Sequence, residues 1–510
     1  MSGKVAALEE LLPGDKYDAD LLANAHPRDW RNPAPAASYN LVVIGAGAAG
    51  LVVAAGAAAL GARVALVEKS LMGGDCLNVG CVPSKAILRS ALFHADLRGA
   101  AAFGGQRPAQ PQIDFGVAME RMRSIRAHLS HHDSAPRFRE LGVDVFFGEA
   151  AFAGPRSVKV EGATLNFTKA VIATGARAAR PALEGLEAAG YLTNETVFNL
   201  TERPRRLMVI GGGPLGCELA QAFARLGCEV TIAQNELFFL PQEERDAAEI
   251  LAHSLARDGI QVRLDTEVTK VTSAGGAKRV HLVSYDQEWV VAVDEILAGV
   301  GRVPNVERLN LEAAGVEYDQ ENGVHVNDRM RTSNRRIYAA GDVALEHKFT
   351  HMADATARIV IQNALFFGRK KLSALTIPWC TYTDPAIAHV GLYVREARER
   401  GIPVKTFTVP MSEVDRAVTD GEESGFAKIH VREGTDKILG ATIVARQAGE
   451  MINEITLAMV AGIGLMTISR VIHSYPTQAA AIRQAADAYA RTRLTPFWQR
   501  LAARWLAWSR

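Results

Sequence analysis

The clearest pattern along the chain is a repeated series of apolar run, glycine-rich turn, small-residue helix and second apolar run. The first copy comprises Tyr39–Ile44, Ala48–Leu60 and Arg63–Glu68, and the second comprises Arg206–Ile210, Pro214–Leu226 and Glu229–Gln234. Short apolar runs bounded by turns are typical of buried strands, and a crossover helix joins parallel neighbours. The repeat therefore predicts two βαβ units and, with them, two nucleotide-binding domains.

The C-terminal third follows a different pattern. Strand-like runs are expected at 323–328 and 336–342, with a turn at Gly341 and Asp342. Beyond residue 375, strand-like Ile377–Tyr382 and Phe426–Val431, a turn at Gly440 and long helical stretches from Glu450 predict an α+β unit. The predicted fold class is α/β, with two Rossmann-like domains followed by a C-terminal α+β domain.

Composition narrows the function classes. The chain has 510 residues, of which 48% are hydrophobic and 22% charged, an ordinary balance for a multidomain globular protein. A net charge of +1 argues against an extensive basic surface that would bind nucleic acid. Five cysteines are too few and too unevenly spaced for a secreted disulfide scaffold. The N-terminus lacks the basic start and apolar core of a signal peptide, so we expect a cytoplasmic protein.

One apolar stretch passes a simple length test for a membrane span. Leu41–Ala62 contains no charged residue. It does contain five glycines in a strand-then-helix rhythm and runs into a second short strand. We therefore interpret it as the first βαβ unit.

The first glycine-rich turn carries Gly45, Gly47 and Gly50, with Glu68 at the end of the next strand. Glycines there allow a tight turn and the close approach of a pyrophosphate to a helix N-terminus, whose free N–H groups favour negative charge. Glu68 can accept ribose hydroxyl hydrogens. The pattern predicts a dinucleotide site.

The second turn carries Gly211, Gly213 and Gly216. The following strand ends near Gln234, where neither an acid for a ribose hydroxyl nor an arginine for a phosphate stands. A second dinucleotide is expected, and the choice between NADH and NADPH stays open. Two such sites suit a flavin that receives electrons from a nicotinamide.

A third motif carries the sharpest chemistry. Cys76 and Cys81 lie five residues apart in a glycine-rich segment just after the first unit, and Lys85 follows one turn later. A disulfide accepts the two electrons that a reduced flavin holds, and a nearby cation or helix N-terminus lowers a thiol pKa. A redox-active cysteine pair beside a flavin is therefore predicted.

The motif Cys-Leu-Asn-Val-Gly-Cys-Val-Pro-Ser-Lys at 76–85 resembles the signature of the flavin-dependent pyridine nucleotide–disulfide oxidoreductases. The resemblance runs from about Tyr39 to Thr492, through similar motifs at 173–175, 299–305, 337–342 and 383–391. It implies FAD, NADPH or NADH as electron donor, and a homodimer. The implied domains are an arm (1–38), a FAD domain (39–190 and 311–374), a NAD(P) domain (191–310), a dimerisation domain (375–490) and a tail helix (491–510).

The resemblance also implies residue roles. Cys81 would touch the flavin, Cys76 would exchange with substrate, and Lys85 would lie near the flavin, paired with Glu218. Residues implied to bind FAD are Gly45, Gly47, Gly50, Glu68, Lys69, Gly74, Lys85, Ala150, Thr174, Gly175, Asp342 and Thr350. Those implied to bind the nicotinamide dinucleotide are Gly211, Gly213, Gly216, Gln234, Val268 and Gly301. No resident metal site is expected.

One motif departs from the thiol-reducing members, in which a histidine and a glutamate act as general base across the dimer. Tyr475 stands at the histidine position and Ala480 at the glutamate position, while His473 lies two residues away. A phenol is a poor base at neutral pH. A tyrosine resembles mercuric reductases, whose soft metal substrate needs thiolates more than a base.

Mercury(II) reduction is therefore the leading expectation, with Cys76, Cys81, Lys85, Glu218, His473 and Tyr475 as the catalytic candidates. Two cysteine-containing parts of mercuric reductases, an N-terminal Cys-x-x-Cys domain and a C-terminal cysteine pair, have no counterpart in the sequence. Two alternatives stay open. One is a reductase of a small organic disulfide, of the dihydrolipoamide dehydrogenase or glutathione reductase type. The other is a membrane-peripheral flavoprotein that uses a quinone or a protein partner.

The C-terminal tail supports the second alternative. After Asp487 the sequence holds no acid, and Thr495 and Pro496 predict a helix start. Leu494, Trp498, Leu501, Trp505 and Trp508 then share one face among arginines. Such a helix either packs on the dimer or the arm, or rests on the inner face of an anionic membrane through residues 494–510.

Overall fold

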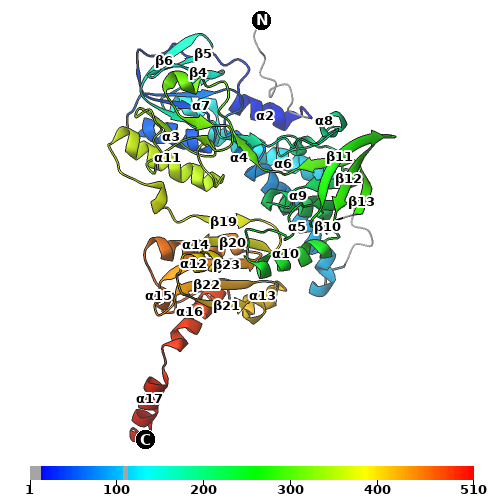
Figure 1. Cartoon of the computed structure of the whole chain (residues 1–510), viewed down its shortest axis with the longest axis vertical. Coiled ribbons are helices and arrows are strands. Elements are labelled where there is room, and N and C mark those ends of the chain that lie inside the picture. Colours follow the sequence, from blue (N-terminus) through cyan, green and yellow to red (C-terminus); the bar gives the residue numbers. More distant parts are fainter. Residues whose placement is uncertain (1–12, 107–112, 286) are drawn as a thin grey trace. The chain divides into compact units, whose positions relative to one another are not determined.

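The computed structural model describes residues 13–106, 113–285 and 287–510, which form two compact units (Figure 1). The first unit comprises the described residues up to Asn235 together with Asp265–Leu375. The second comprises Glu236–Leu264 and Thr376–Arg510. The first twelve residues of the predicted arm lie outside the described residues.

The larger sheet of the first unit has a parallel part and an antiparallel extension. In spatial order, the parallel strands are β3 (Val143–Phe147), β2 (Val64–Glu68), β1 (Tyr39–Ile44), β6 (Ala163–Ile172) and β18 (Ile337–Ala339). β6 also pairs antiparallel with β5 (Ser157–Val160), which pairs with β4 (Ala150–Gly154). Helices α3 (Ala48–Ala59) and α11 (Thr350–Leu365) pack against each other. This confirms the first predicted βαβ unit.

The second βαβ unit is also confirmed. Strands β9 (Glu229–Ala233), β8 (Arg206–Ile210) and β14 (Glu295–Ala298) are parallel, and helix α9 (Pro214–Arg225) connects β8 to β9. A three-stranded antiparallel meander follows, made of β11 (Glu267–Ala274), β12 (Ala277–Ser284) and β13 (Gln287–Val293). Apolar side chains from this meander and from β8 share one buried cluster.

Shorter elements complete the first unit. The helices are α2 (Lys16–Ala25), α4 (Gly74–Asn78), α5 (Cys81–Gly99), α6 (Phe115–Ser130), α7 (Ala135–Glu140) and α8 (Leu186–Ala189). The strands are β7 (Ala176–Ala178), β15 (Arg302–Pro304), β16 (Tyr318–Asp319) and β17 (Gly323–Val324). Single turns of tighter helix lie at Ala100–Phe103, His131–Asp133, Val197–Asn199, Leu311–Ala314 and Leu372–Ala374. The strand predicted over 323–328 is wrong beyond Val324, where the chain leaves the pairing.

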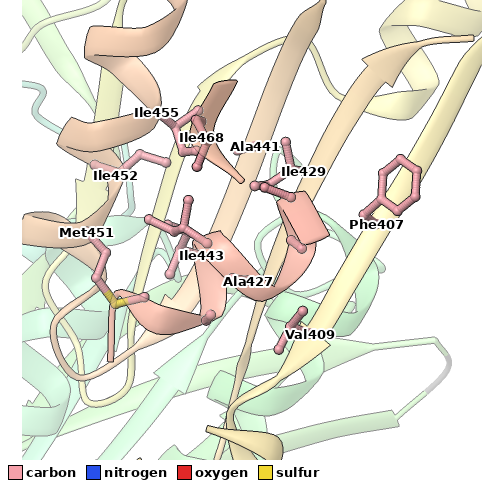
Figure 2. Close-up of a cluster of buried hydrophobic side chains, with 14 of the residues drawn as sticks. Phe407, Val409, Ala427, Ile429, Ala441, Ile443, Met451, Ile452, Ile455 and Ile468 are labelled. Carbon is pink, nitrogen blue, oxygen red and sulfur yellow. The ribbon is translucent and has the colours of Figure 1, made fainter. Parts of the chain in front are cut away.

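The second unit is built on a five-stranded antiparallel sheet. Its strands, in spatial order, are β19 (Pro378–Thr381), β20 (Ala386–Gly391), β23 (Ile438–Ala445), β22 (Phe426–Arg432) and β21 (Val404–Pro410). Alternate apolar residues of these strands pack against helices α14 (Ala448–Val460), α15 (Leu465–Ile468) and α16 (Ala480–Thr492) (Figure 2). The remaining elements are α10 (Arg245–Arg257), β10 (Gln261–Arg263), α12 (Val394–Glu399), a tight turn at Met411–Glu413, α13 (Asp415–Asp420) and α17 (Pro496–Trp508).

Gly440 does not form the turn that its position between apolar runs predicts. It lies within β23, opposite Gly391 of β20. A Cβ atom at Gly440 would come within 2.3 Å of the Leu392 carbonyl oxygen, so the glycine permits close backbone approach inside the sheet. The chain instead reverses at Gly434, whose φ is +77°.

The tail forms the predicted helix. Thr495 is the N-cap residue of α17 and Pro496 its first residue, although in this described segment the Thr495 hydroxyl caps no backbone N–H group. Every residue from 491 to 510 is exposed. Within the part of the chain that the structure describes, none of the helices has the length and apolar character that a bilayer span requires.

Candidate active site

The first glycine turn joins β1 to α3 with little space to spare. Gly45 has a φ of +102°, and a Cβ there would lie 2.3 Å from the Ala173 carbonyl oxygen. A Cβ at Gly50 would lie 1.8 Å from the Gly45 carbonyl oxygen. At Gly47, the N-cap of α3, the nearest atom to a Cβ would be 3.7 Å away. The protein itself thus leaves room at Gly47, as a phosphate approaching this helix N-terminus requires.

Glu68 braces this turn from the end of β2. Its two carboxylate oxygens accept the backbone N–H groups of Ala46 at 2.7 Å and Ser70 at 2.8 Å. Burial raises the pKa of Glu68, and the two N–H donors oppose that shift. A carboxylate oxygen has lone pairs beyond one such bond, so Glu68 can also accept ribose hydroxyls. Lys69, the next residue, is exposed.

Three further predicted positions follow the carboxyl ends of strands β3 and β6. Ala150 begins β4, and the preceding Gly148 donates its N–H to the Glu68 carbonyl at 2.9 Å. Thr174 follows β6, and its hydroxyl donates to the Asn305 carbonyl at 2.7 Å. Gly175 has a φ of +68°, which lets the chain leave the sheet there.

The segment with the two redox candidates crosses directly over the first glycine turn. A Cβ at Gly74 would lie 2.6 Å from the Gly47 Cα atom. Cys76 belongs to the short helix α4, and Cys81 is the first residue of α5. A helix N-terminus favours negative charge, so the backbone at Cys81 suits a thiolate.

Cys76 and Cys81 both carry free thiols that hydrogen-bond to each other. Cys81 Sγ also lies 3.3 Å from Thr350 Oγ1 at the start of α11. The Cys76 hydrogen bond, the Thr350 hydroxyl and the Lys85 charge lower the pKa of Cys81 to about 6, against opposing burial. The same hydrogen bond and burial raise the pKa of Cys76. At neutral pH, the pair therefore holds one thiolate and one thiol.

Lys85 and Glu218 join α5 to α9. Lys85 Nζ lies 2.7 Å from Glu218 Oε2, and the Glu218 side chain is 5% exposed. The lysine thereby offsets a buried carboxylate while keeping its positive charge one helical turn from Cys81. This geometry gives Cys81 a cation whose position is fixed.

The second glycine turn repeats the geometry of the first. A Cβ at Gly211 would lie 2.4 Å from the Gly299 carbonyl oxygen, and one at Gly216 would lie 2.1 Å from the Gly211 carbonyl oxygen. Gly213, the N-cap of α9, has open space around it. The protein therefore leaves room for a second phosphate group at this helix start.

Gln234 closes this second turn from the strand end. Its side-chain oxygen accepts the Gly212 N–H at 2.6 Å, and its carbonyl oxygen accepts the Thr266 N–H at 2.9 Å. Val268 is buried in β11, and Gly301 has a φ of +112° just before β15. The predicted residues of the second site thus lie on elements around one turn.

Arg302 is a site residue that sequence reasoning missed. Its guanidinium pairs with Asp75, next to Cys76, and its Nε lies 3.6 Å from Asp342 Oδ2. Burial raises the pKa of Asp342, and Arg302 opposes that shift. The arginine stood within the noticed motif at 299–305, but nothing in the sequence indicated partners so far along the chain. Asp75, Asp342 and the Thr350 hydroxyl thus lie around residues 72–81, which include Cys76 and Cys81 and are called the redox segment below.

Asp133 was not predicted as a site residue either. It follows two histidines on a polar turn, a pattern that indicates a solvent-exposed segment rather than a buried acid. Burial raises the pKa of Asp133, and its charge helps to raise the pKa of Cys76. In the parts of the chain that the structure describes, no group of three or more His, Cys, Asp or Glu side chains could hold a metal ion.

His473 and Tyr475 belong to the second unit. His473 Nε2 lies 2.9 Å from Glu454 Oε1 on α14, and its Nδ1 lies 3.2 Å from the Val471 carbonyl oxygen. The Tyr475 hydroxyl donates to Asp415 Oδ2 at 2.9 Å, which raises the pKa of this exposed phenol. His473 thus has both ring nitrogens engaged, and Tyr475 stays protonated at neutral pH.

Comparisons with known proteins agree with this geometry. Residues 39–358 match the family described as pyridine nucleotide-disulphide oxidoreductase, and residues 377–486 match its dimerisation domain. A mercuric reductase of Staphylococcus aureus is 35% identical over 451 residues, which cover 88% of this chain and 82% of that relative. A dihydrolipoyl dehydrogenase of Thermus scotoductus is 36% identical over 469 residues, covering 88% and 97%.

Two solved structures are similar as well. The HOCl-induced flavoprotein disulfide reductase RclA from Escherichia coli has a TM-score of 0.79 at 29% identity, covering 88% of this chain and 99% of that one. LpdA from Mycobacterium tuberculosis has a TM-score of 0.81 at 27% identity, with the same coverage. The relatives share a fold and differ in the substrates that their names state.

Proposed function

The chain belongs to the pyridine nucleotide-disulphide oxidoreductases, and from that premise we propose that it uses Cys76 and Cys81 to bind and reduce mercury(II). As a member of this family it uses FAD and NAD(P)H, and its dimerisation domain indicates a homodimer. The substrate is the open question, because relatives named for mercury and for dihydrolipoyl chemistry have similar identities.

The residues present fit both cofactors. The spaces at Gly47 and Gly213, each at a helix N-terminus, would accept the two pyrophosphates. Glu68 and Asp342 would bind the ribose and the ribityl chain of FAD. When bound, FAD supplies a two-electron carrier between the nicotinamide and the sulfur pair.

The observation that carries the choice of mercury is a thiolate beside a second thiol. A Cys81 pKa of about 6 makes it a thiolate at neutral pH, and Cys76 lies within hydrogen-bonding distance of it. Thiolates are the ligands that soft metal ions prefer. Once the metal displaces the Cys76 proton, both sulfurs can hold it.

Mercury(II) reduction and disulfide reduction differ in whether a proton is released or consumed. Reduction of mercury(II) by NAD(P)H yields NAD(P)+, metallic mercury and one released proton. Reduction of a disulfide by NAD(P)H yields two thiols and consumes a proton, which an acid–base group must deliver. Tyr475 of the partner subunit would stand where the family places that group, and its raised pKa makes the phenol a poor proton donor. Both ring nitrogens of His473 lie within hydrogen-bonding distance of acceptor oxygens, those of Val471 and Glu454.

Substrate competition tests the proposal. We expect NADPH oxidation with mercury(II) in excess thiol to exceed clearly the oxidation with oxidised glutathione or lipoamide. Faster turnover of either disulfide than of mercury(II) would contradict the proposal.

Tyr475→His should raise disulfide turnover by about tenfold or more, since a fully oriented acid–base group contributes about 10²–10⁴-fold. Mercury(II) turnover should change little, because that reaction requires no proton delivery. Ala480 supplies no carboxylate to orient the new histidine, which limits the gain. Tyr475→Phe is the matched control and should leave disulfide turnover low.

A second part of the proposal concerns the tail. Trp498, Trp505 and Trp508 of α17 are 56%, 64% and 79% exposed, on a face that Arg500 and Arg504 flank. Exposed tryptophans beside arginines match an interfacial helix on an anionic bilayer. This arrangement favours peripheral membrane contact through residues 494–510.

Co-sedimentation with vesicles tests this contact. The full chain should bind vesicles that contain phosphatidylglycerol, bind less at high salt, and bind neutral phosphatidylcholine vesicles weakly. Removal of residues 494–510 should abolish binding while the dimer persists in sedimentation velocity. Unchanged vesicle binding after truncation would contradict the membrane assignment. Loss of the dimer upon truncation would contradict it as well, and would favour packing of the tail between subunits.

A further inference from the structure

The N-terminal helix α2 packs against α6 (Figure 1), and buried charges connect it to the segment that carries Cys76 and Cys81. Arg126 of α6 lies 2.8 Å from Asp18 of α2, and each side chain is 2% exposed. Arg126 Nη1 also donates to the Asn78 carbonyl oxygen at 3.1 Å. Asn78 is the last residue of α4, between Cys76 and Cys81. One arginine therefore joins the arm to the backbone between the two sulfurs.

Asn78 in turn fixes both sides of its own segment. Its side-chain Nδ2 donates to the Gly74 carbonyl at 2.8 Å and to the Met72 carbonyl at 3.1 Å. The Met72 N–H donates to the carbonyl of Ala25, the last residue of α2, at 3.0 Å. The redox segment is thus tied to α2 at its start through Met72 and near its end through Asn78.

Burying the ion pair between Arg126 and Asp18 costs free energy. The cost indicates that the pair serves to fix the positions of the groups it joins. Taking an arginine and a carboxylate out of water can cancel the energy of their attraction, so such a pair contributes more to fixed geometry than to stability. Burial lowers the pKa of Arg126, and Asp18 opposes that shift. Asp18 is itself held, because its other oxygen accepts the Gly14 N–H at 3.0 Å.

We propose that Arg126, anchored by Asp18, is a positioning residue that sets the relative placement of the Cys76 and Cys81 sulfurs. Helix α2 lies outside residues 39–358, which match the family. Arg126 lies inside that match, whereas its anchor Asp18 comes from a segment that the family match does not include. It rests on the proposed function only in taking these two sulfurs as the reacting groups.

The same two helices provide a matched control. Arg123, one turn before Arg126 on α6, lies 2.7 Å from Asp15 at the N-cap of α2. Its side chain is 6% exposed, so it is comparably buried. Its bond goes to the arm rather than to the redox segment. Loss of Arg123 should loosen the helix contact without moving the sulfurs.

The long-wavelength absorbance between the Cys81 thiolate and FAD, recorded against pH in the reduced, FAD-loaded protein, reports the state of Cys81 without turnover. In the unchanged protein, this absorbance should be half-maximal near pH 6 and weaker below it, as the thiolate is protonated. Arg126→Met should move this midpoint upward by about one unit, toward the ordinary thiol value of about 8.5, because the Cys76 hydrogen bond weakens. Arg123→Met should leave it unchanged.

Two outcomes would overturn the proposal. One is a folded Arg126→Met protein with an unchanged midpoint, and the other is an equal shift in both arginine variants. If the unpaired Asp18 prevents folding of the single variant, the double variant Asp18→Asn with Arg126→Met removes both charges and should show the same shift. The midpoint does not depend on mercury(II) turnover, so failure of the proposed substrate and failure of the positioning role are separately visible.

Discussion

Cys81→Ser is expected to lower mercury(II) turnover by about 10³-fold or more, the scale of losing an essential nucleophile. The substitution removes the thiolate that exists above about pH 6. A serine hydroxyl stays protonated at neutral pH and is a hard ligand for a soft metal. NADPH oxidation with mercury(II) in excess thiol measures the effect. The absorbance of bound FAD should persist, because Cys81 is not one of the glycines that leave room for the FAD pyrophosphate.

Cys228→Ser is the matched control. Cys228 is buried, which raises the pKa of its thiol to about 12, so it is unreactive at neutral pH. The control should retain full turnover and lose only stability, by about 1 kcal/mol. If Cys81→Ser kept a substantial part of the turnover, the sulfur pair would not be the reacting group and the proposed function would fail.

Gly50→Ala should prevent assembly of the FAD site. The new Cβ would lie 1.8 Å from the Gly45 carbonyl oxygen, and a backbone atom cannot move aside as a flexible side chain can. We expect a loss of about 3 kcal/mol or more in the free energy of unfolding, the range of severe overpacking. Thermal unfolding of the flavin-free protein measures this loss.

Gly47→Ala should separate binding from folding at the same turn. Its Cβ would meet only the Gly74 Cα atom, at 3.7 Å, an ordinary contact. The flavin-free protein should therefore unfold at an unchanged temperature. FAD affinity should fall by about tenfold or more, since the methyl group occupies space that a pyrophosphate needs. Full FAD affinity in Gly47→Ala would place the pyrophosphate elsewhere.

Local sequence patterns predicted the regular elements well where sterics act between near neighbours. The bounds of β1 and β8 agree with the predicted runs, because apolar strands end at glycine turns that few other residues allow. The prediction of a turn at Gly440 was wrong because the steric constraint on this residue is not local. Its glycine is required by the Leu392 backbone across the sheet, a neighbour that no local window contains.

The candidate site shows the same limit. The cysteine pair was visible because both sulfurs lie within one short motif, whereas the pairing of Lys85 with Glu218 came from resemblance and not from spacing. Arg302 and Asp75 are 227 positions apart in the chain, and His473, in a loop, meets Glu454 on helix α14. Such contacts depend on how the elements pack, which periodicity does not encode.

The buried pair of Asp18 and Arg126 also means that the family boundary is not a folding boundary. A protein shortened to start at residue 39 would lose helix α2, which packs on α6, and would leave Arg126 without its carboxylate partner on a newly uncovered helix face. Any search for the minimal active enzyme should therefore begin before Asp15 rather than at the first strand.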